Sequence, residues 1–247
     1  MRPGQVRALG PNPNGPRFDR GGKSQVIFDL DGTLLDSWPQ VRSALSHALT
    51  SVGGHNYARD ALQHLTERDI VGPPIEDTLT SMGLRGTSFE QAISIYNAEY
   101  DAICQESHLY DGVEDLLDAL KSQGMSLAIA TMKPKVQAAK IVKAHNIENY
   151  FDCISAPEQA EKRKTELIQA VLETWNVTHE RLATVSAVGD RQTDVEAAYE
   201  CGIRAVFVAW GYGSLDRESV PVANNLNELR TWLLPTKRRA TRAARNA

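Results

Sequence analysis

Five short apolar runs along the chain have the length and composition of buried strands. They cover residues 26–28, 125–132, 151–156, 182–190 and 203–210. In front of each of the last four runs lies a segment whose apolar residues recur every three or four positions, the spacing of a helix with one buried face. These segments cover residues 112–122, 135–145, 165–175 and 194–200. Strands that alternate with helices are typical of an α/β fold, so we expect a doubly wound, parallel-sheet (Rossmann-like) core.

A stretch of about 70 residues separates the first run from this regular alternation. Its apolar pattern is helical throughout, at residues 41–52, 58–65, 75–82 and 89–105. A connection of this length is an inserted unit rather than a loop. We therefore expect a helical cap domain at residues 37–106. The α/β core then consists of the two flanking segments, residues 24–36 and 107–234, and the hinges lie near Ser37 and Gly112.

Composition adds three exclusions. Hydrophobic residues make up 42% of the 247 residues, and no apolar run approaches the roughly 18 residues that span a bilayer. The N-terminus lacks the apolar segment of a secretory signal, so we expect a cytoplasmic protein without membrane contact. The three cysteines, Cys104, Cys153 and Cys201, are widely spaced and form no CxxC pattern. This argues against a disulfide framework and against structural zinc.

The net charge of −4 hides an asymmetry between the ends and the middle of the chain. Residues 1–23 carry five basic residues and one acidic residue, and residues 235–247 carry five basic residues and no acidic one. We expect both segments to be disordered basic tails. The remainder then has a net charge of about −13, which argues against a nucleic acid as the main partner.

The first apolar run ends in two aspartates, Asp29 and Asp31, followed by Gly32. Open α/β sheets bind their ligands at the carboxyl ends of the strands. An ordinary Asp–Gly turn after a strand explains Asp31 and Gly32, but it does not explain Asp29. Two carboxylates this close repel one another and require a cation or a shared proton.

Other strands of the predicted sheet also end in polar residues. Thr131 ends the second run, Asp190 ends the fourth with Asp194 four residues later, and Lys164 opens a helix. At the converging carboxyl ends these residues, with the first two aspartates, give four carboxylates, one hydroxyl and one ammonium group. A hard divalent cation balances such a site, and Mg²⁺ prefers oxygen ligands together with a substrate phosphate. The hydroxyl and the ammonium group suit a phosphoryl group.

With these residues identified, the sequence resembles the haloacid dehalogenase superfamily over about residues 24–234. The family's four motifs are matched in order by FDLDGTLLDS, Thr131, Lys164 and GDRQTD. The chain is most similar to phosphoglycolate phosphatase-like enzymes with a helical cap after the first motif. That similarity extends to the segments VGPPIEDTL, LYDGVEDLLDALKSQG, IATMKP and WGYGS. The first and fourth motifs are specific, whereas the middle two are short.

The resemblance implies a role for each aspartate. Asp29 would be the nucleophile that forms an aspartyl-phosphate. Asp31 would protonate the leaving oxygen and then activate the hydrolytic water. Mg²⁺ would be held by the Asp29 carboxylate, the Asp31 backbone carbonyl and Asp190, with Asp194 supporting it directly or through water.

The resemblance also implies that Thr131 and Lys164 bind the transferring phosphoryl group. From the residues alone, Thr131 could instead cap a helix, Asp194 could be a capping carboxylate, and Lys162 in the same basic cluster is an alternative to Lys164.

Two further positions concern the substrate. Met132 stands where close relatives often carry a small polar residue, so the substrate pocket is less polar there if this side chain contacts substrate. In the cap, the loop at residues 67–74 is the first candidate for substrate choice. Arg68 in this loop is either a substrate-binding residue or a solvated residue at a helix end.

Together these inferences predict a Mg²⁺-dependent phosphatase that hydrolyses a small phosphorylated metabolite, most similar to phosphoglycolate phosphatase. A 5′-nucleotidase is the close alternative, and a phosphomutase is a third. A halide-removing enzyme has no use for Asp31 or for the metal cluster. The sequence leaves open whether the protein is a monomer or a homodimer.

Overall fold

A six-stranded sheet forms the centre of the computed structural model, which describes residues 24–158, 162–216 and 220–234. The strand order is β5-β4-β1-β6-β7-β8, and every neighbouring pair is parallel. The expectation of a doubly wound parallel sheet is confirmed. The strands are β1 (Gln25–Phe28), β4 (Ser126–Ala130), β5 (Cys153–Ser155), β6 (Val185–Gly189), β7 (Arg204–Val208) and β8 (Val222–Ala223).

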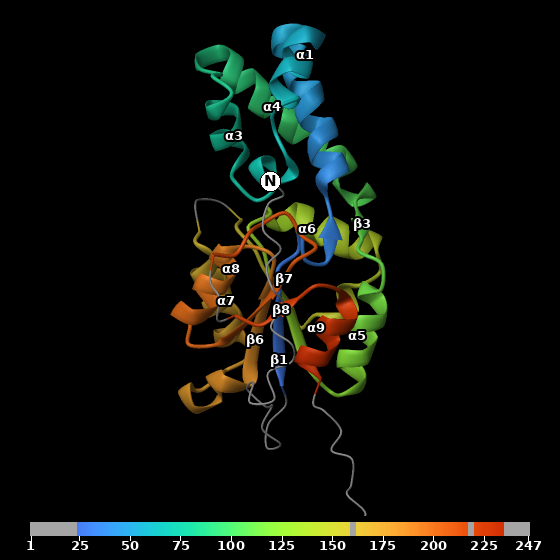
Figure 1. The fold of residues 1–247 in the computed structure, drawn as a ribbon, viewed down its shortest axis with the longest axis vertical. Helices are drawn as coiled ribbons and strands as arrows, with labels where there is room; N and C mark the ends of the chain where they lie inside the picture. Colours follow the sequence, from blue (N-terminus) through green and yellow to red (C-terminus); the bar gives the residue numbers. More distant parts are fainter. Residues whose placement is uncertain (1–23, 159–161, 217–219, 235–247) are drawn as a thin grey trace, which may run out of the picture.

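Helices cover both faces of this sheet (Figure 1). On one face lie α5 (Val113–Ser122), α6 (Lys135–Ala144) and α9 (Leu226–Leu233), and on the other lie α7 (Lys164–Thr174) and α8 (Gln192–Glu200). Each face of the sheet has its own hydrophobic cluster, and alternate residues of β1 belong to different clusters. Val26 and Phe28 pack on the first face, and Ile27 packs on the second. A strand buried on both faces has a continuous apolar sequence, which is why residues 26–28 stand out in the chain.

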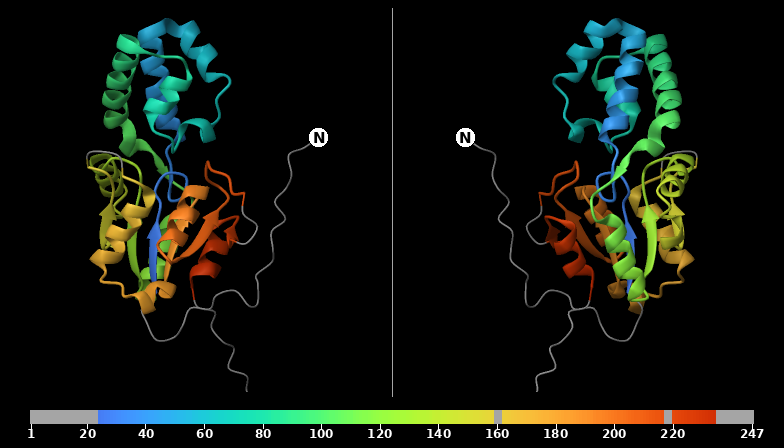
Figure 2. Two further views of the ribbon diagram at one scale, coloured as in Figure 1. Left: turned by 90° about the vertical axis from the view of Figure 1, so that its left-hand side faces the viewer. Right: turned by 90° about the vertical axis from the view of Figure 1, so that its right-hand side faces the viewer.

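A helical unit stands above the carboxyl ends of the strands (Figures 1 and 2). We call it the cap, and our proposed bounds for it are residues 37–106. It consists of α1 (Trp38–Leu62), α2 (Glu67–Ile70), α3 (Ile75–Ser81), α4 (Gly86–Ile103) and the 3₁₀ helix η1 (Cys104–Glu106). Helix α1 is broken at Gly54, where φ is 81° and ψ is 170°, so it corresponds to the two helices expected at residues 41–52 and 58–65.

The two connections between the cap and the rest of the chain pair with one another. Strands β2 (Leu35–Asp36) and β3 (His108–Leu109) form a short antiparallel ribbon, with Leu35 opposite Leu109. The amide of Tyr110 extends the ribbon by donating to the Leu34 carbonyl at 3.0 Å. The cap is therefore joined to the sheet by a paired ribbon rather than by two independent linkers.

Several local predictions were wrong or incomplete. The strand expected at residues 182–190 begins only at Val185, because its first three residues belong to the 3₁₀ helix η3 (His179–Thr184). The loop expected at residues 67–74 contains the one-turn helix α2. Strand β8 and helix α9 were not predicted, and η2 (Glu148–Tyr150) is a further short 3₁₀ helix. The two basic tails lie outside the described residues.

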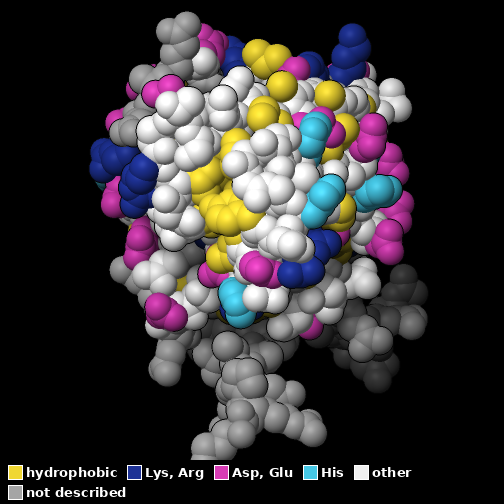
Figure 3. Space-filling view, turned by 90° about the horizontal axis from the view of Figure 1, so that it is seen from above, with side chains coloured by type: hydrophobic (Ala, Val, Ile, Leu, Met, Phe, Trp, Pro, Cys, Tyr) yellow, Lys and Arg dark blue, Asp and Glu magenta, His cyan; other side chains and the backbone are white. Residues whose placement is uncertain are grey.

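Viewed from the cap end, hydrophobic side chains form a strip across the surface, with charged side chains and histidines around it (Figure 3). The cap contributes several partly buried apolar residues to the core cluster, including Tyr57, Met82 and Phe89. The small cap therefore leaves part of its apolar surface accessible. Across the part of the chain that the structure describes, no helix combines the length and the hydropathy needed to cross a bilayer.

Helix α5 provides a test of the packing. Leu120 is fully buried against the sheet, whereas Glu114 on the same helix is exposed. Truncation of a buried leucine removes transfer free energy and leaves a cavity, so Leu120→Ala should lower the free energy of unfolding by about 2–5 kcal/mol. Glu114→Gln should change it by less than about 0.5 kcal/mol. Urea unfolding followed by circular dichroism measures both, and equal values would contradict this packing.

Candidate active site

Two strand ends and two helix starts converge beneath the cap. Asp29 directly follows β1, Asp190 directly follows β6, Asp194 lies in the first turn of α8, and Lys164 is the first residue of α7. The Lys164 ammonium nitrogen lies 2.6 Å from Asp29 Oδ1 and 2.7 Å from Asp194 Oδ1. The structure thus brings together four of the residues that the sequence analysis singled out.

Asp194 has two partners of different kinds. Its Oδ2 accepts a hydrogen bond from the Arg191 amide at 3.0 Å, which caps the start of α8, while Oδ1 faces Lys164. The sequence left a capping role and a site role as alternatives for this residue. The geometry is compatible with both, because each uses a different carboxylate oxygen.

Asp190 is completely buried and is held by backbone amides. Its Oδ2 accepts from the Tyr212 amide at 2.8 Å and from the Gly213 amide at 3.0 Å. Its Oδ1 has no hydrogen-bond partner among the described residues. Gly32 passes so close that an added Cβ would lie 2.4 Å from Asp190 Oδ2, and its φ of +78° also favours glycine.

This arrangement fits a divalent cation. Each of Asp29, Asp190 and Asp194 offers a carboxylate oxygen, and these oxygens lie within 4.8 Å of one another. The single ammonium group of Lys164 does not balance three carboxylates. An unpartnered, buried Asp190 Oδ1 is costly unless something binds it. Oxygen-only donors of this kind suit Mg²⁺.

The electrostatic strain of the site is visible in its pKa values. Burial raises the pKa of Asp29 to about 8; Lys164 opposes this rise, and the neighbouring carboxylates Asp194 and Asp190 add to it. Burial, with Asp194, also raises the pKa of Asp190 to about 6, against the two backbone amides. Burial alone would lower the pKa of Lys164, but Asp194 and Asp29 outweigh it and raise that pKa. The binding of a proton or a cation by these carboxylates is therefore favoured.

Thr131 follows β4 and is buried. Its hydroxyl oxygen accepts from the Lys133 amide at 3.1 Å, so it closes a local turn and does not cap α6, whose first helical residue is Lys135. Acceptance of this bond leaves the hydroxyl proton without a partner among the described residues. Thr131 can therefore donate to a ligand.

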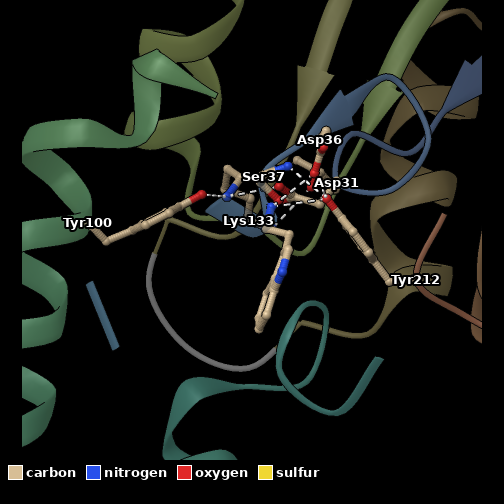
Figure 4. A network of polar contacts seen from close by, with 8 residues as sticks. Asp31, Asp36, Ser37, Tyr100, Lys133 and Tyr212 are labelled. Atoms are coloured by element: carbon tan, nitrogen blue, oxygen red, sulfur yellow. Dashed lines mark hydrogen bonds and ion pairs between the residues drawn. The ribbon is translucent and has the colours of Figure 1, made fainter. Parts of the chain in front are cut away.

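Asp31 lies beside a buried lysine that the sequence analysis did not assign. The Lys133 ammonium nitrogen is 3.2 Å from Asp31 Oδ1, an ion pair without hydrogen-bond geometry. The same nitrogen donates to the hydroxyl of Tyr100 on α4 at 2.5 Å (Figure 4). A residue of the core thus connects Asp31 to the cap.

The remaining predicted residues lie in different settings. Arg68 is exposed on α2, and its backbone carbonyl accepts a hydrogen bond from the Arg191 guanidinium at 3.3 Å. Met132 is 44% exposed. Lys162 is exposed, so of the two candidate lysines Lys164 is the one that contacts Asp29.

Besides Lys133, sequence reasoning missed two further residues that join this site to the cap and its hinge. The Arg191 guanidinium donates to the Val71 carbonyl in the predicted specificity loop. The Tyr212 hydroxyl accepts from the Ser37 amide at 2.8 Å and donates to Asp36 Oδ1 at 2.7 Å, as Figure 4 shows. Both lie inside motifs that the sequence analysis quoted, but their partners are more than 100 positions away in the chain.

Comparison with known proteins shows the family to which the chain belongs. The model of the haloacid dehalogenase-like hydrolase family matches residues 26–208. The chain is 39% identical to tyrosine-protein kinase PtkA of Mycobacterium tuberculosis, over 84% of this chain and 72% of that protein. It is 30% identical to a phosphoglycolate phosphatase of Colwellia psychrerythraea, with 77% and 86% covered. It is 29% identical to a 5′-nucleotidase of Pseudomonas aeruginosa, with 77% and 85% covered.

Solved structures show the same fold. A haloacid dehalogenase-like hydrolase from Streptococcus pneumoniae superposes with a TM-score of 0.74 at 25% identity, covering 86% of this chain and 99% of that one. PtkA of Mycobacterium tuberculosis superposes with a TM-score of 0.70 at 36% identity, over the same shares. With its motifs, its fold and its family-model match in agreement, the chain belongs to the haloacid dehalogenase-like hydrolase family.

Proposed function

We propose that this protein is a Mg²⁺-dependent phosphatase that hydrolyses a small phosphate monoester through an aspartyl-phosphate on Asp29. The observation that carries the proposal is the Lys164 ammonium group between Asp29 and Asp194, with Asp190 beside them. This set supplies a nucleophile, a cation for the phosphoryl oxygens and a site for a divalent metal. Family membership supports the same chemistry.

In the first step, an Asp29 carboxylate oxygen attacks phosphorus in line with the ester oxygen. The O–P bond to Asp29 forms while the bond to the leaving oxygen breaks. Lys164 neutralises the phosphoryl oxygens, and Thr131 donates its free proton to one of them. Asp29, Asp190 and Asp194, with the Asp31 carbonyl, would hold Mg²⁺, which supplies charge neutralisation and Lewis acidity when bound.

Asp31 transfers a proton in each of the two steps. In the first step its carboxyl group donates a proton to the leaving oxygen, so that an alcohol departs rather than an alkoxide. In the second step its carboxylate takes a proton from the water that attacks the aspartyl-phosphate, and inorganic phosphate leaves. The cap above the site would limit the access of other water.

The substrate we propose is a compact ester similar to phosphoglycolate. Support comes from the likeness to phosphoglycolate phosphatase and from the position of the cap over the carboxyl ends of the strands. Nucleoside 5′-monophosphates are the alternative, on the likeness to the 5′-nucleotidase. The same residues would also serve a phosphomutase, which is the third possibility.

The identity of 39% to PtkA provides a second candidate function. An aspartyl-phosphate can be discharged to a tyrosyl hydroxyl as well as to water, and the residues of the first step would be unchanged. The two functions differ in the final phosphoryl acceptor. We propose water, because the helices of the cap stand over the carboxyl ends of the strands and the likeness to phosphoglycolate phosphatase favours a small substrate.

The nucleophile assignment is tested by Asp29→Asn. This change removes the attacking oxygen charge, so kcat should fall by about 10³-fold or more. The melting temperature should stay the same or rise, because a buried charge is removed. Asp60→Asn, at an exposed position of α1, is the matched control and should retain full activity. Substantial turnover by Asp29→Asn would refute the assignment.

Metal binding has a readout that does not depend on activity. A ligand that binds only the folded state at 100 times its Kd adds about 2.7 kcal/mol of stability, or about 5–10 °C in Tm for a chain of this size. Mg²⁺ should therefore raise the Tm of the wild type, and EDTA should reverse the effect. Asp190→Asn should abolish the rise, while Asp60→Asn should preserve it. An equal rise in Asp190→Asn would place the metal elsewhere.

Substrate and acceptor are tested together. We expect kcat/KM for 2-phosphoglycolate to exceed that for purine and pyrimidine 5′-monophosphates by at least about tenfold, a difference of about 1.4 kcal/mol. With a tyrosine-containing peptide and ATP present, we expect free phosphate and no phosphopeptide. A preference for nucleotides would support the nucleotidase, and accumulation of phosphopeptide would support the kinase.

A further inference from the structure

Lys133 is a buried cation to which the proposed function assigns no role. Only 6% of its side-chain surface is exposed. Removal of an ammonium group from water costs several kcal/mol, and an ion pair seldom recovers more than that cost. A buried lysine is therefore weak evidence for stability and indicates another role.

The contacts of Lys133 join three parts of the molecule (Figure 4). Its backbone amide donates to Thr131 beyond β4, and its ammonium nitrogen lies 3.2 Å from Asp31 Oδ1 beyond β1. The ammonium also donates to the Tyr100 hydroxyl on cap helix α4 and lies 4.5 Å from the centre of that ring. Tyr96 stacks on Tyr100 at a centroid distance of 5.7 Å, which fixes the ring further.

We propose that Lys133 is the positioning residue for Asp31 and that Tyr100 makes this positioning depend on the cap. The inference rests on the proposed function, in which Asp31 donates a proton to the leaving oxygen. Lys133 contacts one carboxylate oxygen of Asp31 and so restricts the rotation of that side chain. Tyr100 lies on cap helix α4, so its hydroxyl accepts from Lys133 only when α4 lies over the core.

A purely structural role for Lys133 fits the contacts less well. A second pair already joins α4 to the core, since Lys140 on α6 donates to Asp101 on α4 at 2.5 Å. The side chains of that pair are 40% and 48% exposed, and Asp101 is the neighbour of Tyr100 in the chain. Within the part of the chain that the structure describes, the pair makes no ion pair with Asp31. It can hold the cap to the core without burying a charge, so Lys133 adds the link to Asp31.

The choice of substrate separates positioning from stability. An alkyl phosphate ester requires a proton on its leaving oxygen, whereas p-nitrophenyl phosphate releases a stabilised phenolate and requires little protonation. Loss of a well-placed general acid typically costs 10²–10⁴-fold in rate. A variant that misplaces Asp31 should therefore lose far more activity on the alkyl ester than on the nitrophenyl ester.

The experiment compares kcat and KM of the full chain with Mg²⁺ on 2-phosphoglycolate and on p-nitrophenyl phosphate. We expect Lys133→Met to lower kcat on the alkyl ester by about 10²-fold or more and on the nitrophenyl ester by less than about tenfold. Lys133→Arg should recover part of the loss, because it restores a cation. Tyr100→Phe removes only a hydroxyl group and conserves packing. It should lower kcat on the alkyl ester by about tenfold and should lower kcat on the nitrophenyl ester by less.

Lys140→Met is the matched control, because it removes a cap contact of the same kind without touching Asp31; both substrates should retain wild-type kcat. Equal losses on the two esters in Lys133→Met and Tyr100→Phe, or no loss in either, would overturn the inference. If the wild type hydrolyses neither ester, the proposed function is overturned, and the inference with it. The two failures are thus distinguishable.

Discussion

Repulsion between buried carboxylates is the constraint around which this molecule is built. Asp29, Asp190 and Asp194 bring oxygens within 4.8 Å of one another, and Lys164 supplies one opposing charge. Burial, together with the charges of Asp194 and Asp190 and against the opposing charge of Lys164, raises the pKa of Asp29 to about 8, so the charged carboxylates are unfavourable unless positive charge is bound. The parallel sheet tolerates the arrangement because strand ends and helix starts hold each carboxylate from a separate element. In the function that we propose, a bound metal and the phosphoryl group would share this charge.

Coupling between the site and the cap comes from residues inside the motifs that the sequence analysis quoted. Tyr212 donates its amide to Asp190 while its hydroxyl contacts Ser37 and Asp36 at the ribbon that joins the cap. Arg191, beside Asp190, reaches the Val71 carbonyl in the cap. Together with the Lys133 contacts, these bonds give the site several routes by which cap position can alter the chemistry below it.

The sequence predicted the parts of this structure that depend on local pattern. The sheet, the cap helices and the convergence of Asp29 with Lys164 follow from apolar runs and from the rule that ligands bind at the carboxyl ends of parallel strands. Strand β8 is only two residues long and is too short to leave a pattern. The long-range contacts were beyond reach for another reason, since Lys133 and Tyr100 are ordinary residues until the fold places them together. For Arg68 the sequence left a substrate-binding and a solvated position open, and the structure shows that this residue is exposed on α2.

The most direct measurement of the central claim is the location of the phosphoryl group during turnover. Wild-type protein mixed with Mg²⁺ and 2-phosphoglycolate, quenched in acid within the steady state and mapped by peptide mass spectrometry, reports this position. The account predicts a phosphoryl group on Asp29, absent from the same peptide of Asp29→Asn. Turnover with the phosphoryl group on another residue would contradict it.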